Sequence, residues 1–159
     1  MSFSIRFTGE PDQYLGDDPS VPFAMGRIVA GGLDEGFAST LYEWSKHDYE
    51  VQWFRSLEQL ITGEVKVALI TQYLNPAESP NLEWWALYRG EGDVVYVQNQ
   101  LRFYDQLGSD FSVPQANNFV AERITVNEDG NRISEWEVPF AEITFFFDRI
   151  KQRNRGTSS

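Results

Sequence analysis

The stretch from residue 84 to residue 103, WWALYRGEGDVVYVQNQLRF, most constrains the fold of this chain. Aromatic and β-branched residues, which strands favour, lie on both sides of Gly90-Glu91-Gly92-Asp93. Two glycines so close together allow a tight reversal, because glycine reaches positive φ without a Cβ clash. The stretch therefore predicts a β-hairpin in which a four-residue turn pairs Arg89 with Val94.

That register divides the hairpin into a core face and a polar face, because side chains alternate along a strand. The core face is interrupted only by Asn99 and contains Trp84, Ala86, Tyr88, Val95, Val97, Leu101 and Phe103. The opposite face contains Glu83, Trp85, Leu87, Arg89, Tyr96, Gln98, Gln100 and Arg102. Because the second face mixes polar groups with aromatics, it is a candidate interface.

Two amphipathic helices are predicted outside the hairpin. Ser45 is a good N-cap, Asp48 stands at the capping-box position, and Gly63 is a natural end for the first helix. Pro139 suits the first position of the closing helix. Apolar residues at helical spacing mark the buried faces: Tyr49, Trp53, Leu57, Leu60 and Ile61 in the first helix, and Phe140, Ile143, Phe147 and Ile150 in the second.

The remaining elements are strands that alternate or run apolar between turn signals. We expect strands at 2–7, 23–30, 36–42, 65–74 (in the middle of a sheet), 120–126 and 132–138, turns at 31–35 and 127–131, and a short helix at 114–118. Hairpins with two covering helices predict an α+β fold and a single domain over residues 1–159. Residues 1–22 are rich in loop signals, and 152–159 are expected to be a frayed basic tail.

The charge is strongly acidic: 13 basic and 24 acidic residues give a formal net charge of −11. Four of the basic residues lie among the last eleven, so residues 1–148 hold nine basic and 24 acidic residues, a formal charge of −15. Such a body repels phosphate backbones and attracts a basic protein, although plain solubility is the alternative explanation. The absence of cysteine, of a signal peptide and of a membrane span favours the cytoplasm.

Patterns for catalysis or metal binding are weak. His47 is the only histidine, and no cysteine could complete a zinc site or a thiol nucleophile. The 127–131 segment lacks the ligand spacing of a calcium loop, so a turn is the better interpretation. Glu135 and Glu137 share a strand face, which suits solvent or a partner better than acid–base chemistry. We therefore expect no enzyme activity, no metal and no cofactor.

Three blocks of residues resemble one known family. They are Tyr42-Glu43-Trp44 leading into Asp48-Tyr49, Trp53, Ser56 and Leu57; then Val95-Tyr96-Val97-Gln98-Asn99; then Asp129-Gly130 followed by Ile133-Ser134-Glu135-Trp136. In order and spacing they resemble CdiI-type immunity proteins of bacterial contact-dependent growth inhibition, and most closely the subgroup whose partner toxins cleave 16S ribosomal RNA.

The resemblance implies a cytoplasmic antidote that binds the C-terminal toxin domain of its cognate CdiA exoprotein, a basic nuclease, and blocks its RNA-binding or active site. It also implies a curved antiparallel sheet similar to the Whirly type, with supporting helices. The alternative function is a Whirly-like protein that binds single-stranded nucleic acid, which the acidic charge opposes. An enzyme is the third and least supported class.

Charge and the hairpin faces together predict where a basic partner binds. The candidate contacts are Glu83, Trp85, Tyr96, Gln98 and Arg102 on the polar face, with Glu91, Asp93, Asp105 and Asp110 in the adjoining loops. The alternative is that the two helices cover this face and that its residues are satisfied internally. We expect no direct contact with nucleic acid or membrane, and the oligomeric state is left open.

Overall fold

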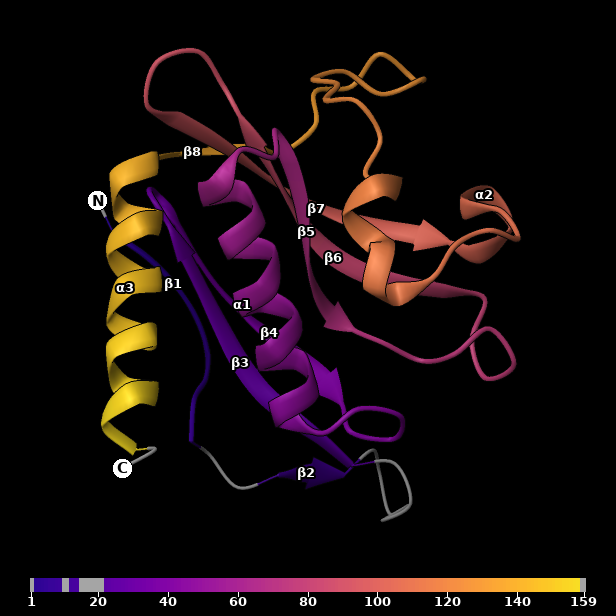
Figure 1. Cartoon of the computed structure of the whole chain (residues 1–159). Coiled ribbons are helices and arrows are strands. Elements are labelled where there is room, and N and C mark those ends of the chain that lie inside the picture. The colour runs from indigo at the N-terminus through magenta and orange to yellow at the C-terminus, as the bar shows by residue number, and fades with distance from the viewer. Residues whose placement is uncertain (1, 10–11, 15–21, 158–159) are drawn as a thin grey trace.

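A computed structural model describes residues 2–9, 12–14 and 22–157 (Figure 1). The strands are β1 (Phe3–Phe7), β2 (Gln13–Tyr14), β3 (Pro22–Ala30), β4 (Leu33–Thr40), β5 (Lys66–Gln72), β6 (Asn81–Arg89), β7 (Val94–Phe103) and β8 (Trp136–Pro139). The helices are α1 (Lys46–Thr62), α2 (Tyr104–Leu107), the 3-10 helix η1 (Val113–Phe119) and α3 (Phe140–Thr157). The predicted α+β class is confirmed.

The strands form two antiparallel sheets, which we call sheet A and sheet B. In sheet A, β3 pairs with β1 on one side and with β4 on the other, and the short β2 pairs with the start of β3. Sheet B has the order β5-β6-β7-β8. Part of the predicted N-terminal loop, residues 10–11 and 15–21, lies outside the described residues.

The β3–β4 hairpin of sheet A is confirmed, but its turn is tighter than expected. Ala30 pairs with Leu33, so only Gly31 and Gly32 connect the strands instead of residues 31–35. Gly31 has a φ of 60°, in the left-handed region that two-residue hairpin turns require.

Helix α1 begins and ends where the sequence predicts. The Ser45 side chain accepts a hydrogen bond from the Asp48 backbone N–H at 3.2 Å, and the Asp48 carboxylate accepts one from the Ser45 N–H at 2.9 Å. This capping box satisfies N–H groups that a helix start leaves unpaired, and it lowers the pKa of Asp48 below its ordinary value. Gly63, at a φ of 134°, ends the helix.

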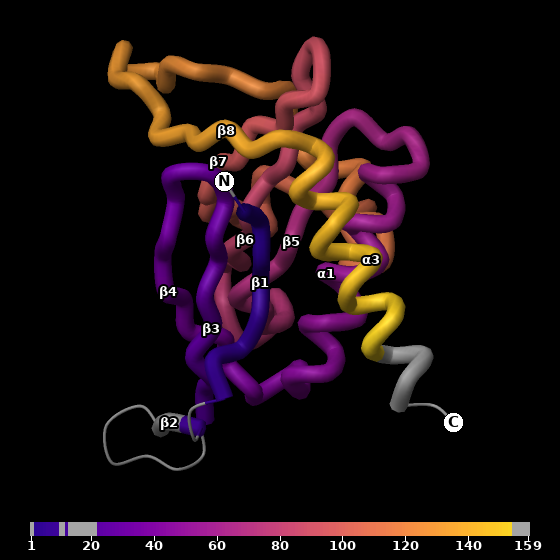
Figure 2. The backbone as a smooth tube through the Cα atoms, turned by 90° about the vertical axis from the view of Figure 1, so that its left-hand side faces the viewer, coloured from indigo at the N-terminus to yellow at the C-terminus, as the bar shows by residue number. Residues whose placement is uncertain are grey.

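Helices α1 and α3 lie on the same side of sheet A (Figure 2). The rings of Phe54 in α1 and Phe147 in α3 stack with their centroids 4.5 Å apart. Trp53 of α1 lies 5.0 Å from the ring of Phe7 in β1 and 5.8 Å from the ring of Phe37 in β4. Buried residues of both sheets and both helices therefore join one hydrophobic core around α1.

Strand β5 is an edge strand, not the mid-sheet strand that its apolar sequence predicts. Side chains from α1 and η1 cover its free edge instead of another strand. Gln52 donates to the Ala68 carbonyl at 2.9 Å and accepts from the Ile70 N–H at 2.8 Å. Trp53 donates to the Ile70 carbonyl at 2.6 Å, and Asn117 accepts from the Ala68 N–H at 2.8 Å. Helix cover explains why β5 is apolar on both faces.

Residues 120–135 do not form the predicted third hairpin. The turn at 127–131 is present, because the Asn127 N–H donates to the Asn131 carbonyl at 2.9 Å. Beyond it, only an isolated bridge joins Val126 to Arg132, and β8 pairs with β7.

Two further predictions concern the short helix at 114–118 and the C-terminal end of the closing helix. The short helix expected at 114–118 is confirmed as the 3-10 helix η1. Helix α3 continues to Thr157, so it includes most of the basic tail, whose fraying stays a prediction.

Candidate functional site

The β6–β7 hairpin is confirmed, but its register differs by one residue from the prediction. The Gly90 N–H donates to the Val94 carbonyl at 2.9 Å, and Arg89 pairs with Val95 rather than with Val94. The turn therefore holds one more residue than expected, and Gly92 supplies its left-handed conformation with a φ of 70°. Because side chains alternate, this shift exchanges the two faces of β7 relative to β6.

The prediction that one face of the hairpin holds all the candidate contacts on the strands is therefore wrong. Glu83 and Trp85 lie opposite Leu101 and Asn99, on the face that carries Val95 and Val97. The other face carries Trp84, Ala86, Tyr88, Tyr96, Gln98, Gln100 and Arg102. The candidate contacts on the strands are thus divided between opposite sides of sheet B.

Residues 121–135 cover the face that carries Tyr96 and Gln98. Gln98 is 1% exposed and donates to the Ile124 carbonyl at 2.9 Å and to the Glu135 carboxylate at 2.7 Å. Arg123 pairs with Glu135 at 2.6 Å, and its guanidinium lies 3.6 Å from the centroid of the Tyr96 ring. The hydrogen bond from Arg123 holds the pKa of Glu135 below its ordinary value. These side chains are satisfied internally.

Arg102 lies near the other end of the same face. Its guanidinium is 5.5 Å from the centroid of the Trp84 ring. The Trp84 indole N–H donates to the Gln100 side chain at 2.9 Å, and Gln100 donates to the Tyr88 hydroxyl at 3.0 Å. Tyr88 in turn donates to the Ala121 carbonyl at 3.0 Å. This chain of hydrogen bonds holds the covering segment on the sheet.

Glu83 and Trp85 line a groove of about 400 Å³ between β4 and sheet B. We call it the β4 groove; its lining residues are Phe23, Glu35, Gly36, Phe37, Ala38, Thr40, Thr71, Gln72, Glu83, Trp85 and Asn99. Glu83 accepts a hydrogen bond from the Asn99 side chain at 3.0 Å. Trp85 is 2% exposed, and its indole N–H is buried without a hydrogen-bond partner. Among the predicted contacts, this pair alone lines the groove.

The four loop carboxylates are exposed and lie in two places. Glu91 and Asp93 are in the β6–β7 turn, whereas Asp105 is in α2 and Asp110 in the loop that follows. Strand β7 separates the two places, and its ten residues span roughly 30 Å at about 3.3 Å per residue. The structure therefore brings Asp105 towards the Glu83 end of the hairpin and keeps Glu91 and Asp93 away from it.

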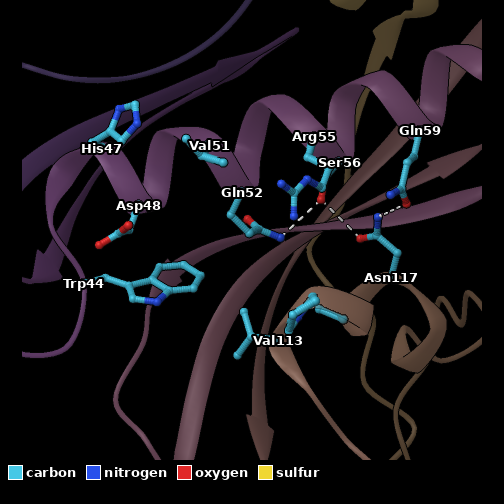
Figure 3. A pocket seen from close by; sticks show the side chains of 12 residues that line it. Trp44, His47, Asp48, Val51, Gln52, Arg55, Ser56, Gln59, Val113 and Asn117 are labelled. Atoms are coloured by element: carbon cyan, nitrogen blue, oxygen red, sulfur yellow. Dashed lines mark hydrogen bonds between the residues drawn. The ribbon is translucent and has the colours of Figure 1, made fainter.

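A second cavity, of about 310 Å³, lies between α1 and η1 (Figure 3). Its floor is a hydrogen-bonded network. Gln52 donates to the Ser56 hydroxyl at 3.1 Å, Ser56 donates to the side-chain oxygen of Asn117 at 3.3 Å, and the Asn117 side-chain amide donates to the side-chain oxygen of Gln59 at 2.7 Å. The same glutamine and asparagine cover the edge of β5, so this network is structural.

This network was not predicted from the sequence, although the sequence contains a signal for it. Gln52, Ser56 and Gln59 are spaced by four and three residues, which places them on one side of a helix. Such a polar stripe beside the apolar face indicates a second packed neighbour. Nothing in the spacing identifies Asn117 as that neighbour.

The structure adds little that supports catalysis. His47 is exposed in the first turn of α1, at the margin of the second cavity. Within residues 2–9, 12–14 and 22–157, no three histidine, cysteine or acidic residues gather as a metal site. Glu135 is engaged by Arg123, while Glu137 is exposed. No helix in the described ranges is long and apolar enough to cross a membrane.

Comparison with known proteins agrees with the resemblance found in the sequence. The family model of the CdiI N-terminal domain matches residues 39–146. The immunity protein CdiI of Enterobacter cloacae subsp. cloacae is 30% identical over 150 residues, which cover 93% of this chain and 98% of that protein. A chain of the CdiA-CT/CdiI toxin and immunity complex from Enterobacter cloacae superposes with a TM-score of 0.82 at 27% identity, covering 94% of this chain and 99% of its own.

Proposed function

This chain belongs to the family of CdiI immunity proteins, and we propose that it binds and neutralises the C-terminal toxin domain of its cognate CdiA exoprotein inside the producing cell. One observation carries the proposal: nearly the whole fold matches a chain from a toxin and immunity complex, with 99% of that chain covered.

We propose further that the toxin is a nuclease and that this chain blocks its RNA-binding or active site. Residues 1–148 carry a formal charge of −15. An enzyme that cleaves RNA needs a basic surface for the phosphates, and an acidic protein is attracted to that surface by the same forces. Inhibition then requires only that the antidote covers the surface.

For the contact surface, we keep the predicted residues that are exposed or line the β4 groove. Glu83 and Trp85 are proposed as direct contacts, with Asp105 and Asp110 at the same end of the hairpin. Glu91 and Asp93 act at longer range by attracting the basic partner. Tyr96 and Gln98 contribute by holding residues 121–135 on sheet B, and Arg102 lies beside Trp84 on the same face.

Neutralisation is tested by inducing the cognate CdiA toxin domain in cells with and without this chain. We expect growth to stop in cells that hold the toxin alone and to continue when this chain is co-expressed. The CdiI of Enterobacter cloacae, at 30% identity, is a matched control for cognate specificity. Failure of this chain to restore growth, together with failure to co-purify with the toxin domain, would overturn the proposal.

The nuclease mechanism needs a separate assay with purified components. Ribosomes incubated with the toxin domain should show cleaved ribosomal RNA, and one equivalent of this chain should abolish the cleavage. Intact RNA with the free toxin would show that the toxin is not a ribonuclease. Cleavage that persists in the purified complex would show that this chain does not cover the active surface.

A further inference from the structure

The outer edge of β4 presents unpaired backbone groups. In the β3–β4 pair, the Leu41 N–H donates to the Pro22 carbonyl at 2.8 Å, so residues 39, 37, 35 and 33 direct their backbone groups towards β3. Residues 34, 36, 38 and 40 therefore direct theirs outward. The Thr40 carbonyl accepts from the Tyr49 hydroxyl, but within the described residues Gly36 and Ala38 have no outward hydrogen-bond partner.

This open edge contrasts with the covered edge of β5. There, side chains of α1 and η1 satisfy both backbone groups of Ala68 and of Ile70. Along β4, by contrast, the stretch from Asp34 to Gly36 and Ala38 is exposed, and β4 lies at the outside of sheet A (Figure 2). An exposed strand edge is a template on which another chain can add a strand.

The β4 groove runs along this edge and offers side-chain contacts across from it. Glu35 lies on the β4 wall and Glu83 on the sheet B wall. Trp85 also lines the groove, and its buried indole N–H lacks an acceptor. Leu101, directly opposite Glu83 on β7, is 52% exposed and extends the sheet B wall with an apolar surface.

We propose that the β4 groove receives an extended, basic segment of the toxin domain, which adds to β4 as a further strand. This inference rests on the proposed function, because it names where the toxin docks. The open backbone of Gly36 and Ala38 supplies hydrogen bonds to the segment, and Glu35 and Glu83 pair with its lysine or arginine side chains. Strand addition also places the segment beside the Trp85 ring, where a cationic side chain gains a further favourable contact.

The charge of the groove favours a basic segment of the toxin domain over a second copy of this chain. Glu35 stands beside the open edge, where Asp34 is already paired with Arg27 at 2.6 Å, and the whole chain carries −11. Two such edges would repel each other, because like charges on neighbouring strands are destabilising. A basic strand gains from the same charges.

Amide hydrogen exchange tests the backbone part of the proposal. In the complex with the cognate toxin domain, the outward amides of residues 34, 36 and 38 should exchange at least about tenfold more slowly than in the free protein, while the 127–131 turn remains unchanged. If the complex forms without this protection, the groove is not the docking site, although the proposed function stands. If no complex forms, the proposed function itself fails.

A backbone variant tests the same point by affinity. Gly36→Pro removes the outward N–H and places a ring on the edge, which an edge strand tolerates. We expect the Kd for the toxin domain to rise at least about tenfold, which corresponds to 1.4 kcal/mol. Gly36→Ala is the matched control, because its Cβ would meet no atom closer than 3.7 Å and its N–H remains.

The Kd values of Gly36→Pro and Gly36→Ala for the toxin domain are compared once the two variants are shown to have equal thermal stability. Equal affinities would overturn strand addition at β4. A concentration-dependent dimer of the free protein that Gly36→Pro abolishes would assign the edge to a second copy and would also overturn the proposal. Should Gly36→Pro fail to fold, the charge variants below test the groove.

The side-chain part is tested by charge reversal. Glu35→Lys combined with Glu83→Lys should raise the Kd at least about tenfold more than Glu128→Lys combined with Asp129→Lys, which changes the net charge equally on an exposed turn outside the groove. Equal losses in the two double variants would show that only the overall charge matters. That outcome would overturn the groove as a specific site.

Discussion

Replacing Gln52 with leucine should lower the free energy of unfolding by about 3 kcal/mol. The reason is that the Gln52 side chain forms hydrogen bonds with the free edge of β5 that a neighbouring strand would otherwise form. Its side chain donates to the Ala68 carbonyl at 2.9 Å and accepts from the Ile70 N–H at 2.8 Å. Ala68 and Ile70 are fully buried. Leucine would leave two buried backbone groups unsatisfied, at about 1–3 kcal/mol each, and would recover a part by apolar burial.

Urea denaturation followed by tryptophan fluorescence measures this loss, and the melting temperature should fall by about 6–12 °C. Gln115→Leu is the matched control, because Gln115 is exposed. In hydrogen exchange, the Ile70 amide should accelerate more than the Leu69 amide, which faces β6. A Gln52→Leu protein as stable as the control, or equal acceleration at both amides, would refute the idea that side chains complete this sheet edge.

Three further changes and one binding assay test other parts of the account. Gly26→Ala should cost about 1–3 kcal/mol in urea denaturation, because its Cβ would lie 2.3 Å from the Phe37 ring, whereas Gly36→Ala should cost under about 0.5 kcal/mol. Ser45→Ala should cost about 1 kcal/mol in the same assay through loss of the N-cap, and an unchanged midpoint would contradict the cap's role. The pKa of Glu135 is lowered in the folded state, so its stabilisation is present above the unfolded pKa of about 4.3 and declines as the pH falls below it; the stability difference between wild type and Glu135→Gln should therefore shrink from pH 6 towards acid. In a gel shift at low salt the chain alone should bind neither RNA nor single-stranded DNA, and tight binding would favour the nucleic-acid-binding alternative.

Local signals predicted helix α1 well. Ser45, Asp48 and Gly63 act through hydrogen bonds and backbone angles within a few residues of each end. Such terms depend little on the rest of the molecule, so the sequence alone was sufficient.

The hairpin shows where local signals were insufficient. Its glycines correctly indicated a turn between residues 89 and 95, but a turn of four or of five residues satisfies the same glycines. The choice depends on how β7 pairs with β8 and on what covers each face, which are tertiary contacts. One residue of difference moved Gln98 from a predicted surface to a position that is 1% exposed.

The hairpin predicted from strands at 120–126 and 132–138 is absent for a related reason. Their alternation and the Asn127 turn resemble a hairpin, yet the Ala121 and Ile124 carbonyls accept hydrogen bonds from side chains of sheet B. Those contacts join residues 26 to 33 positions apart in the chain, and they outweigh local pairing. This cover, added to the register shift of β7, buries Gln98 beneath residues 121–135.

The central claim is that this acidic chain works by occupying a basic toxin domain, and a titration of the purified cognate pair tests it most directly. Binding and toxin activity should be followed together at about 50 mM and about 300 mM salt. We expect loss of toxin activity at one equivalent and an association rate that falls steeply with salt. Full toxin activity at saturating antidote, or an association rate that salt leaves unchanged, would contradict it.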